Sequence, residues 1–163
     1  MLKKVTIYTD GACYPNPGTG GWAAILMHHI DPAPIERVLT GSASDTTNNQ
    51  MEIMAAIQGL SALKFSCHVT LYSDSKYLIN GATKWLKRWK RFNWQTAKST
   101  PVANKDLWQR LDAVMSIHTI DWRWVKAHSG HLLNERVDCL AVEARLSHGK
   151  AAREGVSLPE LGY

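Results

Sequence analysis

Four acidic side chains of this sequence are spaced so that the fold can bring them to a common point. Asp10 follows an alternating segment just before a turn, and Asp74 ends a second short apolar segment. Glu52 lies near the start of a helical pattern, and Asp138 lies in a later one. Acids at these positions also serve as turn, cap or helix-dipole residues or lie on a solvated helix face, so spacing alone does not establish that they converge.

Converging carboxylates predict a particular chemistry. Like charges raise one another's pKa unless cations neutralise them. A set of hard oxygen ligands suits Mg²⁺, or Mn²⁺, rather than zinc. Two such ions about 3.5–4 Å apart activate a water and stabilise a leaving oxygen in phosphodiester hydrolysis.

A histidine-containing loop near the C-terminal end provides a candidate proton carrier. His128 lies in the segment Ala127-His128-Ser129-Gly130, and an imidazole exchanges protons near neutral pH. His131 competes for the same assignment, and an ordinary surface histidine is the simpler alternative.

The elements that must position these groups follow from periodicity and turn signals. Thr47 and Gln50 match a capping box that opens a helix reaching Leu63. Alternating segments predict strands at 3–10, 20–29, 35–43, 69–72 and 120–125, and helical patterns fall at 76–81, 84–92, 104–116 and 132–146. The order predicts an α/β fold, a mixed five-stranded sheet in which parallel strands extend an antiparallel meander, with helices on both faces. One domain is expected over 1–146, followed by an irregular tail over 147–163.

Composition is that of a single globular domain with a basic balance. The 163 residues are 45% hydrophobic and carry a net charge of +5, which suits a polyanionic partner and also suits simple solubility. Three widely spaced cysteines and the absence of a CxxC pair argue against disulfides and structural zinc. No signal peptide or membrane-spanning stretch is seen, so we expect a soluble, cytoplasmic protein.

The segment 84–91 predicts a basic amphipathic helix. Five of its eight residues are Lys or Arg, while Trp85, Trp89 and Phe92 follow helical spacing on one face. A membrane-surface helix, a calmodulin-type target or a packed helix with a solvated side has the same pattern. The net charge favours nucleic acid.

Taken together, the motifs resemble those of type 1 ribonuclease H, and in particular the bacterial enzymes. The resemblance extends from about residue 4 to about residue 146 and rests on Thr9-Asp10-Gly11, Gly20-Gly21-Trp22, Thr47 to Glu52, Ser73-Asp74-Ser75, Val125 to Gly130 and Asn134 to Asp138. It implies a ribonuclease H-like fold and an endonuclease that hydrolyses the RNA strand of RNA/DNA hybrids.

The resemblance also implies roles for the candidate residues. Asp10, Glu52, Asp74 and Asp138 would bind two Mg²⁺ ions, with Asp10 bridging them and Glu52 also contacting a 2′-hydroxyl. His128 would assist proton transfer or product departure, and the products would carry a 5′-phosphate and a 3′-hydroxyl.

The implied substrate-binding residues lie in two regions. Cys13, Asn16, Asn48 and Asn49 match positions near the hybrid's minor groove, and Thr47 matches a DNA-phosphate position. A second group lies in the segment that matches the family's basic protrusion, which holds the DNA strand, or at other positions that match substrate contacts. Its members are Lys76, Trp85, Lys87, Arg88 and Trp108. Departures from the common pattern include Ala12, Lys76 where Gln is common, Ala127 where Gly is usual, and Leu132-Leu133.

Three other functions remain open on the residues alone. They are a non-catalytic binding module for hybrid or double-stranded RNA, a related nuclease acting on DNA, and a small-molecule phosphatase with the same metal chemistry. All four acids are present, which favours an enzyme, and the long basic segment favours a large polyanion. We expect a monomer without an obligate protein partner.

Overall fold

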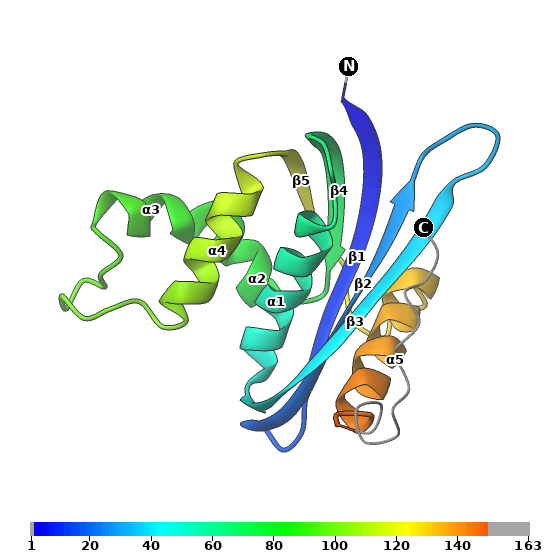
Figure 1. Ribbon diagram of the computed structural model, residues 1–163. Helices are drawn as coiled ribbons and strands as arrows, with labels where there is room; N and C mark the ends of the chain where they lie inside the picture. Colours follow the sequence, from blue (N-terminus) through cyan, green and yellow to red (C-terminus); the bar gives the residue numbers. More distant parts are fainter. Residues whose placement is uncertain (1, 150–163) are drawn as a thin grey trace.

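A five-stranded mixed sheet forms the centre of the computed structural model, which describes residues 2–149. β1 (Lys3–Cys13), β2 (Gly18–His28) and β3 (Ile35–Thr46) form an antiparallel meander, and β4 (Cys67–Ser73) and β5 (Thr119–Trp124) add to it in parallel. The sheet order is β3-β2-β1-β4-β5, so β1 and β4 lie at its centre (Figure 1). The predicted architecture is confirmed.

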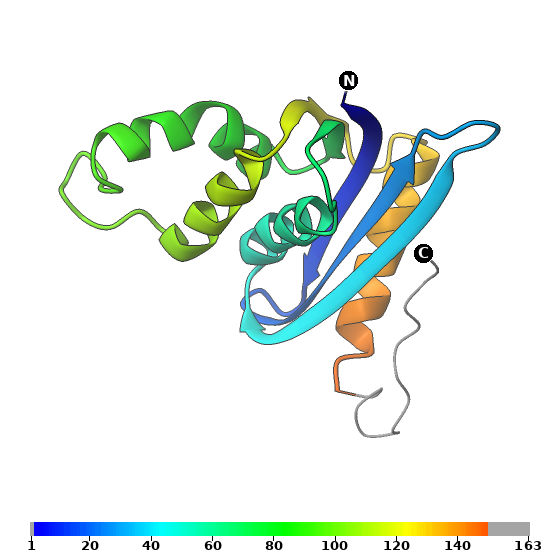
Figure 2. The same ribbon diagram turned by 45° about the horizontal axis from the view of Figure 1, so that its top comes forward.

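Helices cover both faces of this sheet. α1 (Asn48–Ser61), with α4 (Lys105–Met115) packed beside it, lies on one face, and α5 (Leu132–Leu146) lies on the other (Figures 1 and 2). Alternation along β1 explains the two layers. Val5 and Ile7 belong to the core under α1, whereas Tyr8 packs with the apolar side chains of α5.

The predicted cap of α1 forms only in part. The Thr47 hydroxyl accepts a hydrogen bond from the Gln50 backbone N–H at 3.1 Å. The Gln50 side chain does not return to Thr47. It accepts from the Thr46 hydroxyl and donates to Asn104 Oδ1, so it ties α1 to the start of α4.

The helical region after β4 is continuous, although the sequence predicted two separate stretches. α2 (Lys76–Asn80) runs through a π-helical segment, η1 (Gly81–Trp85), into α3 (Leu86–Arg91). Gly81 keeps a helical backbone, so it does not break the helix. Its missing side chain is needed because a Cβ there would overlap the Trp108 indole.

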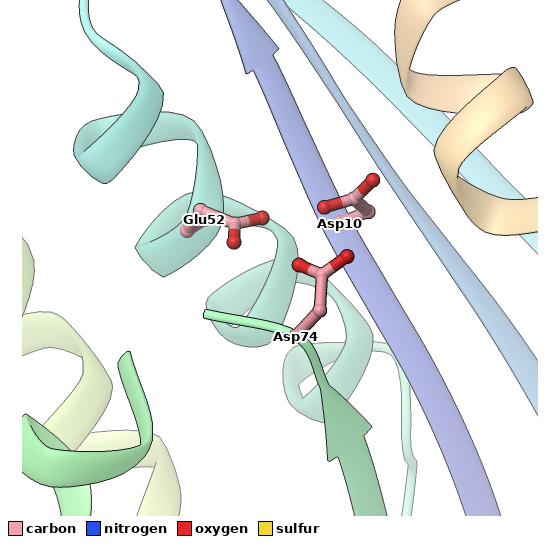
Figure 3. A group of neighbouring side chains, drawn as sticks. All are labelled: Asp10, Glu52 and Asp74. Atoms are coloured by element: carbon pink, nitrogen blue, oxygen red, sulfur yellow. The ribbon is translucent and has the colours of Figure 1, made fainter. Parts of the chain in front are cut away.

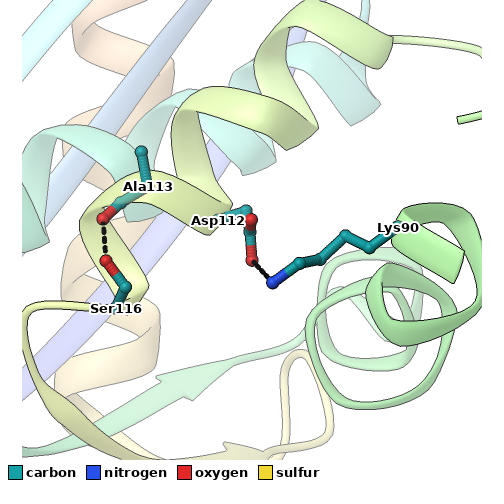
Figure 4. A network of polar contacts seen from close by, with 4 residues as sticks. All are labelled: Lys90, Asp112, Ala113 and Ser116. Carbon is teal, nitrogen blue, oxygen red and sulfur yellow. Dashed lines mark hydrogen bonds and ion pairs between the residues drawn. The ribbon is translucent and has the colours of Figure 1, made fainter. Parts of the chain in front are cut away.

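α3 and residues 92–104 extend away from the sheet, and we call them the protrusion (Figure 2). An aromatic cluster supports its base, with Trp108 completely buried against Tyr77 and Trp89, both at 5.3 Å between ring centroids. An ion pair of 3.3 Å between Lys90 and Asp112 joins α3 to α4, whose last turn is tied by Ser116 Oγ donating to the Ala113 carbonyl (Figure 4).

Three further expectations concern the cysteines, membrane-spanning helices and the C-terminal tail. Cys13, Cys67 and Cys139, which are the cysteines of the chain, are all free thiols in the described structure. Among residues 2–149, no helix is long and apolar enough to cross a membrane. The predicted tail lies outside the described residues from position 150 onward. Before that point, Ser147 and His148 close the last turn of α5 through backbone hydrogen bonds.

We predict that Trp108→Ala destabilises the protein. Removing a completely buried indole leaves a cavity beneath the protrusion, at a cost of about 3–5 kcal/mol in the free energy of unfolding. Urea denaturation followed by circular dichroism measures it. Phe92→Ala is the matched control, because Phe92 is 56% exposed and its loss should change stability little. Equal losses in the two variants would contradict this packing.

Candidate active site

Three carboxylates from three separate elements converge at one end of the central strands. Asp10 lies on β1, Glu52 on α1 and Asp74 immediately after β4. One oxygen from each lies within 4.8 Å of the other two, and Figure 3 shows the three side chains pointing toward one another. The sequence predicted that Asp10 ends its strand. The strand instead continues to Cys13, so Asp10 is held within the β1–β2 ladder opposite Ala23.

Asp138 reaches the same place from the other face of the sheet. It lies on α5 and lines an open cavity of about 440 Å³ together with the other three acids. The remaining walls of this active-site cavity are Gly11, Ala12, Cys13, Tyr14, Asn48, Asn49, Ser75, Val142 and Arg145. All four predicted acids therefore face one cavity.

The register of the central strands explains the convergence. β1 and β4 are parallel neighbours, with Tyr8 paired to Tyr72. Asp10 and Asp74 each come two residues later, so both side chains emerge at the same end of the sheet. Gly11 allows α1 to approach, since a Cβ there would lie 2.5 Å from the Glu52 backbone nitrogen.

Burial and mutual repulsion control the protonation of the cluster. Asp10 and Glu52 are 4% and 7% exposed. Burial, followed by the nearby Glu52 charge, raises the pKa of Asp10 above its ordinary range. Burial also raises the pKa of Glu52, and it raises the pKa of Asp74 although a hydrogen bond from Asn134 opposes the shift. Without a cation, the cluster holds protons that free carboxylic acids would release.

The residues fit a divalent cation. The Glu52 Oε1 atom is buried without a hydrogen-bond partner among the described residues, although buried carboxylate oxygens normally have one. The oxygens available at the cluster are the hard ligands that Mg²⁺ and Mn²⁺ prefer. Asn134 Nδ2 donates to Asp74 Oδ2 at 3.5 Å, which orients that ligand.

The two histidines have different environments. His128 is exposed in the loop before α5, in a left-handed conformation with φ of 54°. It is close enough to lower the pKa of Asp74, as a smaller effect than burial. His131 instead caps α5 by accepting from the Asn134 N–H, and its ring packs against Tyr8 and Tyr72. His131 is therefore occupied structurally, which leaves His128 as the candidate proton carrier.

The minor-groove candidates form one hydrogen-bonded group beside the cavity. The Cys13 backbone N–H donates to Asn48 Oδ1 at 2.6 Å, and the Asn48 N–H donates to Asn16 Oδ1 at 3.2 Å. The Cys13 thiol is buried and bonds to backbone carbonyls. The side chain of Asn49 is exposed at the cavity wall. Thr47 is the cap of α1, so its hydroxyl already has a partner.

The remaining candidates lie on the protrusion side of the cluster. Lys87 and Arg88 are exposed on α3, and Lys76 Nζ lies 4.8 Å from the centroid of the Trp124 ring. Trp85 is half-buried against Tyr77. Trp108 was predicted to contact substrate. Because its side chain is completely buried, it packs against Tyr77 and Trp89 from beneath and offers no surface for direct contact.

Sequence reasoning missed four residues of the site. Asn134, Ser75, Tyr14 and Arg145 either line the cavity or bond to an acid. The helical spacing of Asn134, Asp138 and Arg145, at intervals of four and seven, places the three on one face of α5 and was an available signal. Ser75 belongs to the Ser73-Asp74-Ser75 motif but was given no role, and no comparable signal identifies Tyr14.

The mixed sheet and its acidic cavity define an α/β protein whose carboxylate site is suited to divalent cations. The model of the RNase H family matches residues 2–145, and the chain belongs to that family.

Individual relatives agree with this assignment. Ribonuclease H of Phenylobacterium zucineum is 54% identical over 153 residues, covering 94% of this chain and 97% of the relative. Ribonuclease HI of Caulobacter vibrioides is 52% identical over 143 residues, covering 88% and 93%. The predicted membership of an enzyme family, ribonuclease H, is thereby confirmed.

Solved structures share the fold. LC9-RNase H1, described as a type 1 RNase H with the type 2 active-site motif, superposes with a TM-score of 0.83 at 28% identity, covering 90% of this chain and 74% of that one. LC11-RNase H1, solved in complex with an RNA/DNA hybrid, gives 0.65 at 18% identity over 88% and 98%, which shows the fold alone.

The raised pKa values predict an unusual pH dependence of stability in chelator. A folded-state pKa above the unfolded value contributes stability that is present at acid pH and is lost as pH rises through the folded-state pKa. The metal-free melting temperature should therefore fall from about pH 5 to about pH 8. Asp10→Asn removes one of the carboxyl groups whose pKa is raised on folding, so it should flatten this decline.

Glu143→Gln is the matched control, because Glu143 is exposed on α5 outside the cavity lining. Its melting curve should follow the wild type at each pH. An Asp10→Asn protein that declines as steeply as Glu143→Gln would contradict the proposed coupling among the acids.

Proposed function

We propose that this protein is an endonuclease that hydrolyses the RNA strand of RNA/DNA hybrids by a two-metal-ion mechanism. The products would carry a 5′-phosphate and a 3′-hydroxyl. Family membership supports the substrate class. The observation that carries the mechanism is the convergence of Asp10, Glu52 and Asp74 around a buried, unpartnered carboxylate oxygen.

In this proposal the four acids hold two Mg²⁺ ions, with Mn²⁺ as a substitute. When bound, the ions lower the pKa of a water and stabilise the charge that develops on the phosphate and the leaving oxygen. Asp10, which is 4% exposed, would help to hold both ions. Glu52, whose Oε1 atom has no hydrogen-bond partner among the described residues, would contact a 2′-hydroxyl as well. Attack of water at phosphorus breaks the bond to the 3′-oxygen.

We propose that His128 is the residue that takes up and releases a proton during cleavage. Its imidazole lies in an exposed loop near Asp74 but outside the cavity lining, so it can exchange protons with solvent close to the cluster. A proton held by His128 would assist either proton transfer during cleavage or departure of the product that carries the 5′-phosphate. Ala127 stands where Gly is usual in the family, and its side chain would stiffen this loop.

Selection of hybrids would depend on the two strands meeting different surfaces. Asn16, Asn48 and Asn49 present amides beside the cavity, and an amide both donates to and accepts from a 2′-hydroxyl. The DNA strand would be held by Thr47, Lys76 and Trp85 and by the protrusion residues Lys87 and Arg88. Trp108 would contribute only by supporting the protrusion from below.

We also propose that the protein acts as a cytoplasmic monomer without an obligate partner. Three free thiols are typical of a reducing compartment. One described domain contains all the candidate residues.

The principal test is cleavage of a hybrid labelled on its RNA strand. We expect cleavage with Mg²⁺, none with chelator, and none by Asp10→Asn, while single-stranded RNA, RNA duplex and DNA duplex stay intact. If the new 5′ ends accept label from a polynucleotide kinase only after phosphatase treatment, they carry a 5′-phosphate. Tight, salt-dependent hybrid binding without cleavage would instead identify a binding module.

We predict that the two neighbouring histidines separate catalysis from stability. His128→Ala should lower kcat about 100-fold while leaving the melting temperature and its rise with Mg²⁺ unchanged. His131→Ala loses the helix cap and the tyrosine contacts, so it should lower the free energy of unfolding by about 1 kcal/mol or more. Full activity in His128→Ala would rule out its role as proton carrier.

A further inference from the structure

One cation faces the acidic cavity. Arg145 is the single basic side chain among the described residues that line it. It lies in the last turn of α5, seven residues after Asp138, so both side chains share a helix face. A guanidinium so close to four acids would ordinarily pair with one of them.

Arg145 makes no such ion pair. Within residues 2–149, the ion pairs are Lys90–Asp112, Arg123–Asp121 and Arg136–Glu36. The recorded contact of the Arg145 guanidinium is with the Tyr14 ring, at 5.8 Å from Cζ to the centroid. Stacking on an aromatic face leaves the N–H groups at the edge of the guanidinium free to donate.

Close packing of α5 on β2 holds the backbone of Arg145 in place. The last turns of α5 pack so closely on β2 that a Cβ at Gly21 would overlap the Ala141 carbonyl and the Arg145 nitrogen. Tyr14 is anchored by its N–H to the Thr19 carbonyl at 3.2 Å, while 74% of the residue is exposed at the cavity rim. A pre-positioned cation beside an exposed aromatic ring suits a polyanionic ligand.

We propose that Arg145, positioned by Tyr14, binds a phosphate of the RNA strand next to the one that is cut. This inference rests on the proposed function, which places the scissile phosphate in the same cavity. Phosphates along one strand recur about every 3.4 Å of helix axis, so a neighbour of the scissile group must pass close to the rim. The planar guanidinium donates two hydrogen bonds to such a phosphate. Its charge also offsets the repulsion between the acids and the incoming strand.

The simpler alternative is that Arg145 only balances the dipole at the end of α5. The two roles predict different kinetics. Arg145→Ala should raise the KM for hybrid about tenfold with kcat nearly unchanged. The slope of log affinity against log salt should become shallower by about one, and Arg145→Lys should restore that slope.

Arg136→Ala is the matched control, because it removes the same charge from the same helix, but from a side chain paired with Glu36 outside the cavity lining. It should leave KM and the salt slope unchanged. If Arg145→Ala matches Arg136→Ala in both quantities and only its melting temperature falls, the helix-dipole role holds and the inference is overturned.

A double-mutant cycle tests the part played by Tyr14. Tyr14→Ala should raise KM in the wild-type background and add nothing in Arg145→Ala, whereas Tyr14→Phe should behave as wild type. Additive effects would overturn the positioning role. An unmodified protein that binds hybrid without cutting it would overturn the proposed function itself, a result distinct from active variants with unchanged KM.

Discussion

Repulsion among buried carboxylates is the constraint that the rest of this structure must satisfy. Asp10, Glu52 and Asp74 bring their oxygens within 4.8 Å of one another, and Asp10 and Glu52 are buried. Such a cluster persists only if rigid surroundings hold it together and protons or cations neutralise it. The paired central strands and the tight contact of α1 at Gly11 provide the rigidity. Burial raises the pKa of Asp10 and of Glu52, which favours protons on the metal-free cluster that divalent ions can replace.

The distribution of positive charge follows from the same constraint. Cations paired directly with the acids would compete with metal ions, and no Lys or Arg of residues 2–149 forms an ion pair with Asp10, Glu52 or Asp74. Basic residues instead lie around the cavity, with Lys87 and Arg88 exposed on the protrusion and Arg145 at the opposite rim. A long polyanion can meet these cations while its reactive phosphate enters the acidic centre.

Most of the scaffold could be predicted from the sequence because local patterns determine it. The alternation in β1 and the Thr47 cap are local signals, and both correspond to real elements. The continuity of α2, η1 and α3 depends on packing of Trp108 against Gly81, and the burial of Trp108 depends on aromatic partners distant in sequence. The four acids were found through motif resemblance, since their convergence is a tertiary property. The contact of Tyr14 with Arg145 joins two elements that no local pattern relates.

Proton release on metal binding tests the central claim most directly. Lightly buffered, metal-free protein near neutral pH would be titrated with MgCl₂ or MnCl₂ while the pH is held constant by measured addition of base. We expect saturable release of about one proton per protein molecule, decreasing at higher pH and strongly reduced in Glu52→Gln. Saturable metal binding without proton release would show that the carboxylates are already ionised. Equal release by Glu52→Gln would show that the proton comes from another group, and either result would contradict this explanation.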